Sequence, residues 1–390
     1  MLDDATIEFI AQHREEDVRT LALQAGRYPT VDMREAVTQI EGWQHAREKL
    51  PEWAAVEGII YPPKISMEQC SSEKTAKYKA GLIEGKMFAD LTGGFGIDFS
   101  YMARGFGEAF YIERNERLCD IATANFSRLR LDHVKVLNGN SEELFGTLPH
   151  LDWIFVDPAR RDGDGRKVVA LSDCEPNVVE LDLLSKADMA MIKCSPMLDI
   201  TMACRQLGSV SSVHIISVNN ECKELLIILN SGNFTGITTH CVNILKDGGV
   251  QTFSFTQEEE DLASISYCSE VGKYLYEPNA SIQKAGCPKS LGAHYHVDKL
   301  HPNSHLYTSI EHLHDFPGRT FEVVEVLGFS KADIKRVQSL GKANITVRNF
   351  PENVQLLRKR LKLADGGENY IFATTLNDSS KVLIVCKKAE

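Results

Sequence analysis

Residues 87–98 read MFADLTGGFGID and place three glycines between an apolar run and the start of a helical pattern. The run Met87–Leu91 predicts a buried strand. The turn after it, at Gly93, Gly94 and Gly96, predicts a tight strand-to-helix connection. Glycines let the backbone come close to a ligand, and the next helix offers free N–H groups to polar or anionic groups. Taken alone, the turn also fits a connection that binds nothing.

Short apolar runs and helical stretches alternate from this point. Strands are expected at Met87–Leu91, Ala109–Glu113, Val134–Asn138, Trp153–Asp157, Met189–Cys194, Val213–Val218 and Glu224–Leu229. Alternation of buried strands with helices predicts a doubly wound α/β sheet. Only residues 219–223 separate the last two runs. Because this connection is too short for a crossover helix, these two strands should form an antiparallel hairpin.

The segments around this core have a different pattern. Residues 1–80 carry apolar positions at helical spacing and predict a helical region, whose last helix has N-cap candidates at Ser71–Ser72. A hairpin is expected around residues 247–249, and the acidic run Glu258–Asp261 is expected to be a solvated loop. The stretch 274–316 predicts a small α+β insertion.

The C-terminal part is expected to alternate strand, helix, strand, helix and two strands, an order typical of a compact α+β module. These elements are expected at Thr320–Val326, Ala332–Leu340, Ala343–Val347, Val354–Leu361, Tyr370–Leu376 and Lys381–Cys386. The chain should therefore comprise a helical region, a cofactor-binding domain, a small insertion or linker domain and a basic module, at residues 1–80, 81–235, 236–316 and 317–390.

The composition is that of an ordinary globular protein, with 390 residues of which 43% are hydrophobic and 25% charged. A net charge of −11 argues against a uniformly basic coat for nucleic acid, although a local basic patch stays possible. The ten cysteines are scattered singly, so a reduced, cytoplasmic protein is expected. The acidic N-terminus and the lack of a run of about 18 apolar residues predict neither a signal peptide nor a membrane span.

Two acidic residues restrict the ligand that the glycine turn could hold. Glu113 ends the second expected strand, where its carboxylate can accept hydrogen bonds from both hydroxyls of a ribose. A dinucleotide fingerprint needs a third glycine where Phe99 stands, and Asp90 directly before the turn would repel a pyrophosphate. Both departures favour a nucleoside cofactor with an ammonium group and no phosphate at this place. S-adenosylmethionine fits that description.

Four motifs, each at the end of a successive strand, resemble those of the class I S-adenosylmethionine-dependent methyltransferases: Asp90–Gly96, Glu113, Asn138–Ser141 and Asp157–Arg160. The resemblance implies that the glycine turn cradles the methionine part of the cofactor. It further implies that the acid ending the second strand holds the ribose, and that the residues after the third strand meet the adenine. Cofactor contacts are accordingly expected from Asp90, Thr92, Gly93, Gly94, Phe95, Gly96, Glu113, Arg114, Asn140, Ser141, Asp157 and Pro158.

A local resemblance to the trimethylguanosine synthases rests on Ser72–Ala76, ahead of the glycine turn. In those enzymes this helix covers the cofactor. The resemblance therefore adds Thr75 to the expected contacts.

The fourth motif, Asp157-Pro158-Ala159-Arg160-Arg161, follows a buried strand and should face the methyl group of the cofactor. Methyl transfer is an in-line displacement, so the protein mainly has to align the two reactants. Asp157 could orient the target or take its proton. Nucleic-acid enzymes that methylate exocyclic amines carry an aromatic residue in this motif, which stacks on the target base. Ala159 and Arg160 stand there instead, which argues against such a target.

A different target follows if Cys194 is a nucleophile. The fourth motif also resembles that of the uridine-C5 RNA methyltransferases, in which a cysteine after the fifth strand attacks the base, and Lys193–Pro196 matches that second turn in part. However, residues 163–165 stretch the spacing between the two motifs, and no general base is evident near the last strands. A buried thiol at a strand end is therefore the favoured interpretation of Cys194, with the nucleophile as the alternative.

A basic segment and a histidine-rich segment lie in the C-terminal part. Residues 330–362 hold nine Lys and Arg against Asp333 and Glu352. Such a segment suits contact with a phosphate backbone, and it suits a solvated helix face equally well. The whole chain resembles bacterial predicted methyltransferases that end in a THUMP-like module, which implies RNA binding. Six of the twelve histidines lie within 294–314, but they lack a Cys or carboxylate partner at ligand spacing, so no metal is expected.

The sequence thus predicts a cytoplasmic S-adenosylmethionine-dependent methyltransferase that acts on RNA, on a base of tRNA or rRNA. Two functions of other classes fit parts of the chain. A nicotinamide-dependent oxidoreductase would share the α/β architecture but conflicts with Asp90 and Phe99. A non-catalytic RNA-binding protein that keeps the methyltransferase fold would account for the atypical fourth motif.

Overall fold

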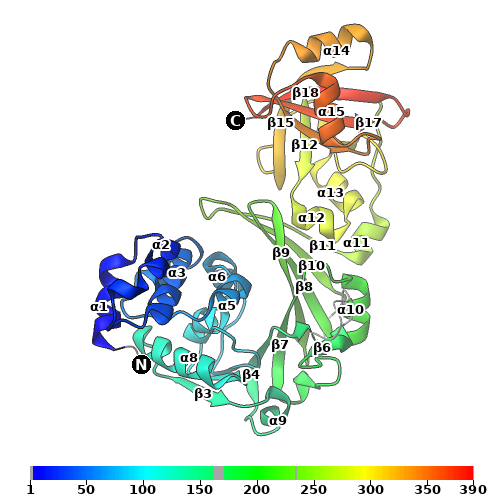
Figure 1. Cartoon of the computed structure of the whole chain (residues 1–390). Helices are drawn as coiled ribbons and strands as arrows, with labels where there is room; N and C mark the ends of the chain where they lie inside the picture. Colours follow the sequence, from blue (N-terminus) through cyan, green and yellow to red (C-terminus); the bar gives the residue numbers. More distant parts are fainter. Residues whose placement is uncertain (1–2, 161–170, 233–234, 390) are drawn as a thin grey trace. The chain divides into compact units, whose positions relative to one another are not determined.

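The computed structural model describes the chain in three stretches, residues 3–160, 171–232 and 235–389 (Figure 1). Arg161 and residues 163–165, which belong to the motif spacing discussed above, lie outside the described residues. In the described stretches no helix is long and apolar enough to cross a lipid bilayer.

The chain divides into two compact units. The first comprises Met1–Ser211 and Leu226–Phe234, and the second comprises Ser212–Leu225 and Thr235–Glu390. The glycine turn and the other motifs of the expected cofactor site belong to the first unit, so the site is described within that unit.

The N-terminal region is helical, as expected. Its α-helices are α1 (Asp4–His13), α2 (Val18–Leu23), α3 (Met33–Lys49), α4 (Pro51–Ala54), α5 (Lys64–Gln69) and α6 (Glu73–Ala80). The Thr75 amide donates a hydrogen bond to the Ser72 hydroxyl at 3.3 Å, which confirms Ser72 as the N-cap of α6. Pro51 begins α4 as well as ending α3, because a missing N–H is tolerated in the first turn of a helix.

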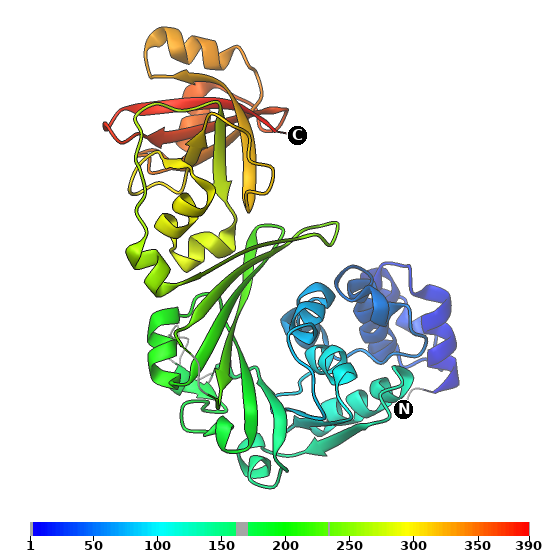
Figure 2. The same cartoon turned by 180° about the vertical axis from the view of Figure 1, so that it is seen from behind.

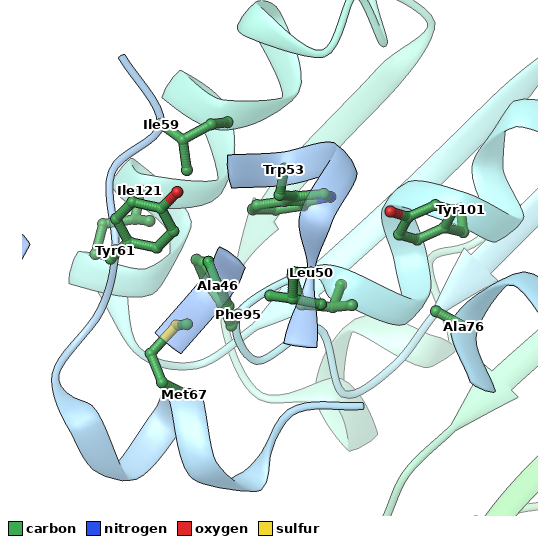
Figure 3. Close-up of a cluster of buried hydrophobic side chains, with 11 residues drawn as sticks. Ala46, Leu50, Trp53, Ile59, Tyr61, Met67, Ala76, Phe95, Tyr101 and Ile121 are labelled. Carbon is green, nitrogen blue, oxygen red and sulfur yellow. The ribbon is translucent and has the colours of Figure 1, made fainter. Parts of the chain in front are cut away.

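A buried apolar cluster joins this helical region to the glycine turn (Figure 3). Trp53 of α4 packs edge-on against Phe95 in the turn, with ring centroids 5.0 Å apart. Tyr61 adds a second ring at 6.4 Å from Phe95. Removal of these surfaces from water holds the helices against the first strand-to-helix connection of the sheet. The buried members are Ala46, Leu50, Trp53, Ile59, Tyr61, Met67, Ala76, Phe95, Ile97, Tyr101 and Ile121.

In the described part of the chain, nine strands form one sheet in the order β11-β10-β8-β9-β7-β4-β1-β2-β3. Strands β3, β2, β1, β4 and β7 are successive parallel neighbours, so their carboxyl ends meet at one edge. All seven strands expected here are present, which confirms the α/β fold. Their bounds are β1 (Met87–Asp90), β2 (Glu108–Glu113), β3 (Val134–Asn138), β4 (Leu151–Val156), β7 (Ala187–Cys194), β8 (Val210–Val218) and β9 (Glu221–Asn230).

The remaining elements of this part are short. β5 (Ala159–Arg160) and β6 (Cys174–Glu175) pair with each other outside the large sheet. The helices between the strands are α7 (Ile97–Met102), α8 (Glu116–Arg128), α9 (Ser141–Phe145) and α10 (Ile200–Leu207). Single 3₁₀ turns occur at Ala25–Arg27, Ala103–Gly105, Leu171–Asp173 and Leu183–Ser185.

The expected antiparallel hairpin is formed by β8 and β9. Only Asn219 and Asn220 join these strands, both with positive φ (51° and 64°), and a two-residue connection of this kind reverses the chain. The hairpin expected around residues 247–249 is also present, as the antiparallel strands β10 (Thr238–Ile244) and β11 (Val250–Thr256).

The acidic run at 258–261 is a helix, so the expectation of a solvated loop was wrong. Thr256 and Glu259 form a capping box that begins α11 (Gln257–Leu262). Glu260 is 6% exposed, and its carboxylate accepts hydrogen bonds from the Ser290 amide (2.8 Å) and the Ser290 hydroxyl (2.7 Å) at the start of α13. A carboxylate placed on the free N–H groups of another helix stabilises that helix, which a reading of local charge alone overlooks.

The C-terminal elements follow the expected order. In the described chain their strands form one seven-stranded sheet together with the strands of residues 274–309, in the order β13-β14-β12-β15-β18-β17-β16. Figure 2 shows α14 and α15 in orange beside these strands. The two helices pack on the sheet through Val337, Leu357 and Leu361. The elements are β12 (Tyr274–Pro278), α12 (Ala280–Ala285), α13 (Pro288–Tyr295), β13 (Asp298–Lys299), β14 (Tyr307–Ser309), β15 (Gly318–Leu327), α14 (Lys331–Gln338), β16 (Asn344–Arg348), α15 (Val354–Leu361), β17 (Asn369–Thr375) and β18 (Lys381–Lys388).

Candidate active site

A cavity of about 310 Å³ opens at the carboxyl edge of the parallel strands, within the size range of small-molecule sites. The glycine turn, the ends of β2, β4 and β7, and the segment between α5 and α6 contribute residues to its lining. The expected contact residues that line it are Asp90, Thr92, Gly93, Gly94, Phe95, Gly96, Glu113, Arg114, Asn140, Ser141 and Asp157.

The glycines of the turn are required by its geometry. The Gly93 amide donates to the Ile112 carbonyl at 2.8 Å, which ties the turn to β2. A Cβ atom on Gly93 would lie 2.2 Å from the buried Tyr111 ring, closer than any real contact. Gly96 has φ of 86°, a left-handed conformation that side chains disfavour. Packing against Tyr111 and the left-handed backbone therefore require glycine at these two positions of the turn.

Asp90 is a buried carboxyl at the bottom of the cavity, with 1% of its surface exposed. It accepts hydrogen bonds from the amide and the hydroxyl of Thr92, at 2.8 and 3.2 Å. Burial raises the pKa of Asp90 to about 8, and the nearby charges of Asp98 and Asp157 add to the shift. The site therefore contains an acid that can stay neutral at physiological pH and ionise beside a cation.

Glu113 joins the end of β2 to the turn. One carboxylate oxygen accepts from the Gly94 amide at 2.9 Å, and the other accepts from the Asn115 amide at 2.8 Å. Each oxygen of an ionised carboxylate can accept a second hydrogen bond. The side chain is thus fixed in place and still able to accept from two ligand hydroxyls.

The residues that follow β3 also line the cavity. The Asn140 side-chain oxygen accepts from the Glu142 amide at 2.7 Å and caps α9, so its orientation is fixed. Arg114 forms an ion pair with Glu175 at 3.0 Å, and both residues line the cavity. An amide, a hydroxyl and a charged pair around one end of the cavity suit a polar heterocycle.

A row of charged side chains leads from the cavity to α6. Lys193, at the end of β7, places its Nζ 2.6 Å from Oδ2 of Asp157 and 3.3 Å from Oδ2 of Asp98. Lys79 of α6 lies 3.2 Å from the other oxygen of Asp98, and the Ser71 hydroxyl donates to Asp98 at 2.7 Å. Burial alone would raise the pKa of Asp98, but the charges of Lys79 and Lys193 outweigh it and lower that pKa to about 2.

Comparison with known proteins agrees with this geometry. A crystal structure of a protein from Porphyromonas gingivalis W83, provisionally named a methyltransferase, matches over 100% of both chains, with 36% sequence identity and a TM-score of 0.90. An uncharacterized S-adenosylmethionine-dependent methyltransferase of Mycobacterium tuberculosis is 24% identical over 305 residues, which are 76% of this chain and 80% of that protein. The chain belongs to the S-adenosylmethionine-dependent methyltransferases.

Family comparison also assigns the C-terminal part of this methyltransferase. Residues 274–317 match a ferredoxin-like domain, and residues 318–388 match a THUMP-like domain. The cofactor is S-adenosylmethionine, and the bare glycine turn, the buried Asp90 and the fixed Glu113 fit a cationic nucleoside. The described residues hold no cluster of three or more His, Cys, Asp or Glu that could bind a metal ion.

Three of the expected site residues do not line the cavity. Thr75 is 2% exposed, and its hydroxyl donates to the Ser72 carbonyl at 3.1 Å within α6. Pro158 and Cys194 are also absent from the lining. Cys194 is 8% exposed, and burial raises the pKa of its thiol well above the ordinary value, so the thiolate is disfavoured.

The methyltransferase site also contains residues that the sequence motifs did not indicate. Cys70 and Ser71 line the cavity from the connection between α5 and α6, and Asp98 and Lys193 line it from α7 and β7. Asp98 stands in the first turn of the helix after the glycines, and Lys193 stands beside Cys194, so both positions were visible as polar residues near motifs. No pattern in the sequence showed that Lys79 contacts Asp98, because this contact depends on how α6 packs on α7.

Proposed function

We propose that this methyltransferase transfers its methyl group to RNA, to a base of tRNA or rRNA. The observation that carries this proposal is the THUMP-like C-terminal domain with its exposed lysines. THUMP modules are RNA-binding, and exposed cations suit contact with a phosphate backbone.

The charges available for RNA on this domain are fewer than the sequence indicated. Four arginines of the basic segment are in ion pairs: Arg336 with Glu325, Arg348 with Glu277, Arg358 with Asp365, and Arg360 with Glu352. Five exposed lysines make no ion pair among the described residues, and they supply the charges that we assign to RNA contact: Lys331, Lys335, Lys342, Lys359 and Lys362.

In the proposed binding mode, the cofactor lies along the cavity from the glycine turn to α9. Asp90 and the turn hold the methionine part, because the carboxyl of Asp90 can ionise beside an ammonium group. Glu113 accepts from the ribose hydroxyls with its two remaining acceptor positions. Asn140 and Ser141 contact the adenine.

Asp157 is the group that we place beside the acceptor atom of the RNA. When bound, the cofactor would supply a methyl group on a positively charged sulfur. The acceptor would form its bond to that carbon in line as the carbon–sulfur bond breaks, and S-adenosylhomocysteine would leave with the electron pair. The Asp157 side chain is 41% exposed at the cavity and can accept a hydrogen bond from an acceptor that carries a proton. It then takes up that proton directly or through water as the new bond forms.

The structure favours a nitrogen or oxygen acceptor over carbon 5 of uridine. A carbon target needs a cysteine thiolate within reach of the base. Cys194 is buried, lies off the cavity lining and has a raised thiol pKa. Uridine-C5 methylation with Cys194 as nucleophile is the second candidate.

The substrate class can be tested in an extract of cells from which the gene has been deleted. Purified methyltransferase and cofactor with a tritiated methyl group are added, and the labelled extract is divided between ribonuclease and protease. We expect ribonuclease to release the label and protease to leave it. Label that resists ribonuclease and is lost on proteolysis would contradict the RNA proposal, and boiled enzyme provides the background.

A further inference from the structure

Lys193 stands between two carboxylates that line the cavity but differ in how far their side chains are exposed. Its Nζ is 2.6 Å from Asp157, whose side chain is 41% exposed, and 3.3 Å from Asp98, whose side chain is 10% exposed. The Lys193 side chain is itself 13% exposed. We propose that Lys193 is a positioning residue that fixes the Asp157 carboxylate toward the acceptor, and that Asp98 and Lys79 anchor Lys193. The inference rests on the acceptor role proposed for Asp157.

The need for such a residue follows from the place of Asp157. Asp157 follows the last residue of β4, and its backbone amide donates to the Thr92 hydroxyl at 2.7 Å, which holds the backbone but not the carboxylate. A half-exposed aspartate without a side-chain partner has several rotamers of similar energy. A charge-assisted bond at 2.6 Å selects the one that reaches Lys193. Catalysis by alignment depends on such selection, because small displacements of a reacting group lower the rate strongly.

Lys193 can carry its charge in this enclosed place because the row is balanced. Lys79 and Lys193 supply two positive charges, and Asp98 and Asp157 supply two negative ones. Lys79 is 0% exposed, so its charge depends on the Asp98 carboxylate. Asp90 also faces the group; it is mostly neutral at pH 7 in the free protein, and in the proposed complex its charge is opposed by the cofactor ammonium. Each charge of the row therefore has an opposite charge beside it.

The far end of the row lies in the N-terminal helical region. Lys79 belongs to α6, and its Nζ lies 3.3 Å from the Ser71 hydroxyl, which in turn donates to Asp98. Ala76 on the same helix belongs to the apolar cluster that packs on the glycine turn (Figure 3). The helical region thereby contributes an electrostatic support for the catalytic carboxylate, in addition to a wall of the cavity.

Three variants test the inference. Lys193→Met keeps the length of the side chain and removes the charge, and Lys193→Arg keeps the charge. Lys135→Met removes a lysine that pairs with Glu108 on the sheet, outside the cavity lining, and is the matched control. For Lys193→Met we expect kcat on RNA to fall about 10- to 100-fold while KM for RNA and the Kd of S-adenosylhomocysteine change less than about threefold.

The pattern across variants separates positioning from a merely structural role. Lys193→Arg should recover much of the lost kcat, and adding Lys193→Met to Asp157→Asn should lower kcat little further, because Lys193 acts through the Asp157 carboxylate. Equal kcat in Lys193→Met and Lys135→Met would overturn the inference. A parallel loss of cofactor affinity and thermal stability in Lys193→Met, without rescue by arginine, would overturn it as well.

A crystal structure of Lys193→Met with S-adenosylhomocysteine gives a readout that needs no RNA. We expect the Asp157 carboxylate to leave its present position or to occupy several rotamers. An unchanged, ordered carboxylate would refute the positioning role even if RNA is methylated. If the wild-type enzyme labels no RNA but the carboxylate moves in this structure, the RNA proposal fails and the role of Lys193 stands.

Discussion

The raised pKa of Asp90 predicts that cofactor binding depends on pH. A carboxyl with a pKa of about 8 is ionised in about one molecule in eleven at pH 7 and in about one in two at pH 8. If only the ionised form holds the cofactor ammonium, the apparent Kd at pH 7 is about 11-fold above its limiting value, and at pH 9 it is within about 10% of that value. Affinity should therefore rise with pH, and binding at pH 7 should release close to one proton.

The raised pKa of Asp90 also makes the stability of the free protein depend on pH, but stability falls with rising pH whereas cofactor affinity increases. Because folding raises the pKa of Asp90 from 3.8, its contribution to stability is complete below about pH 4 and is lost progressively as the pH rises from about 4 to about 8. At pH 7 the loss is about 4 kcal/mol relative to acid conditions. A protein with ligand bound should not show this loss, because the bound cation favours the ionised form.

Calorimetry in buffers of different ionisation enthalpy measures the released proton, with Asp90→Asn as the comparison. The asparagine variant should bind more weakly at pH 9 and should lack the part of the proton release that belongs to Asp90. Titration of the cofactor amine is common to both proteins and cancels in the difference. Equal proton release and equal pH slopes in the two proteins would refute the assignment of a neutral Asp90.

Three further predictions concern separate parts of the molecule. Glu113→Ala should weaken S-adenosylhomocysteine binding about 100-fold or more in calorimetry, since two charge-assisted hydrogen bonds are each worth about 1.5–3 kcal/mol. The control Glu108→Ala, on the same strand, should bind normally. An unchanged Kd in a folded Glu113→Ala protein would remove the ribose assignment. Cys194→Ala should methylate RNA at a rate close to that of the wild type, and 5-fluorouridine-substituted RNA should form no covalent adduct on denaturing gels; an adduct would establish the uridine-C5 mechanism. Replacement of the five exposed lysines by glutamine should reduce the slope of log binding constant against log salt concentration for RNA by about 3.5–4.5 in filter-binding assays, while cofactor affinity is kept. An unchanged slope would place RNA elsewhere than at Lys331, Lys335, Lys342, Lys359 and Lys362.

The fold and the gathering of most motif residues around one cavity could be predicted because the deciding signals are local. Glycines between a strand and a helix, and an acid at the end of the next strand, lie within a few residues of the geometry that they create. Parallel pairing then brings the ends of β1, β2 and β4 to one edge without further information. For this reason Asp90, Glu113 and Asn140 line one cavity, as the sequence indicated.

What sequence reasoning missed depends on contacts between distant residues. Lys79 and Lys193 come together with Asp98 only because α6 packs on α7 and β7 lies two strands from β1. Glu260 looked like part of a solvated run because its partner, Ser290, begins a helix further along the chain. The excess charge of the basic segment was overestimated for the same reason, since Arg348 pairs with Glu277 on another strand.

Methylation of tRNA and rRNA that were made without this enzyme shows whether RNA is its substrate. Total tRNA and rRNA from the deletion strain and from its parent are incubated with the purified enzyme and S-adenosylmethionine that carries a trideuterated methyl group, and the nucleosides are analysed by mass spectrometry. We expect one deuterated methylnucleoside in the RNA of the deletion strain, and little or none in the parental RNA, where that position is already methylated. Equal absence of the label from both RNAs, with an enzyme that binds the cofactor, would contradict it.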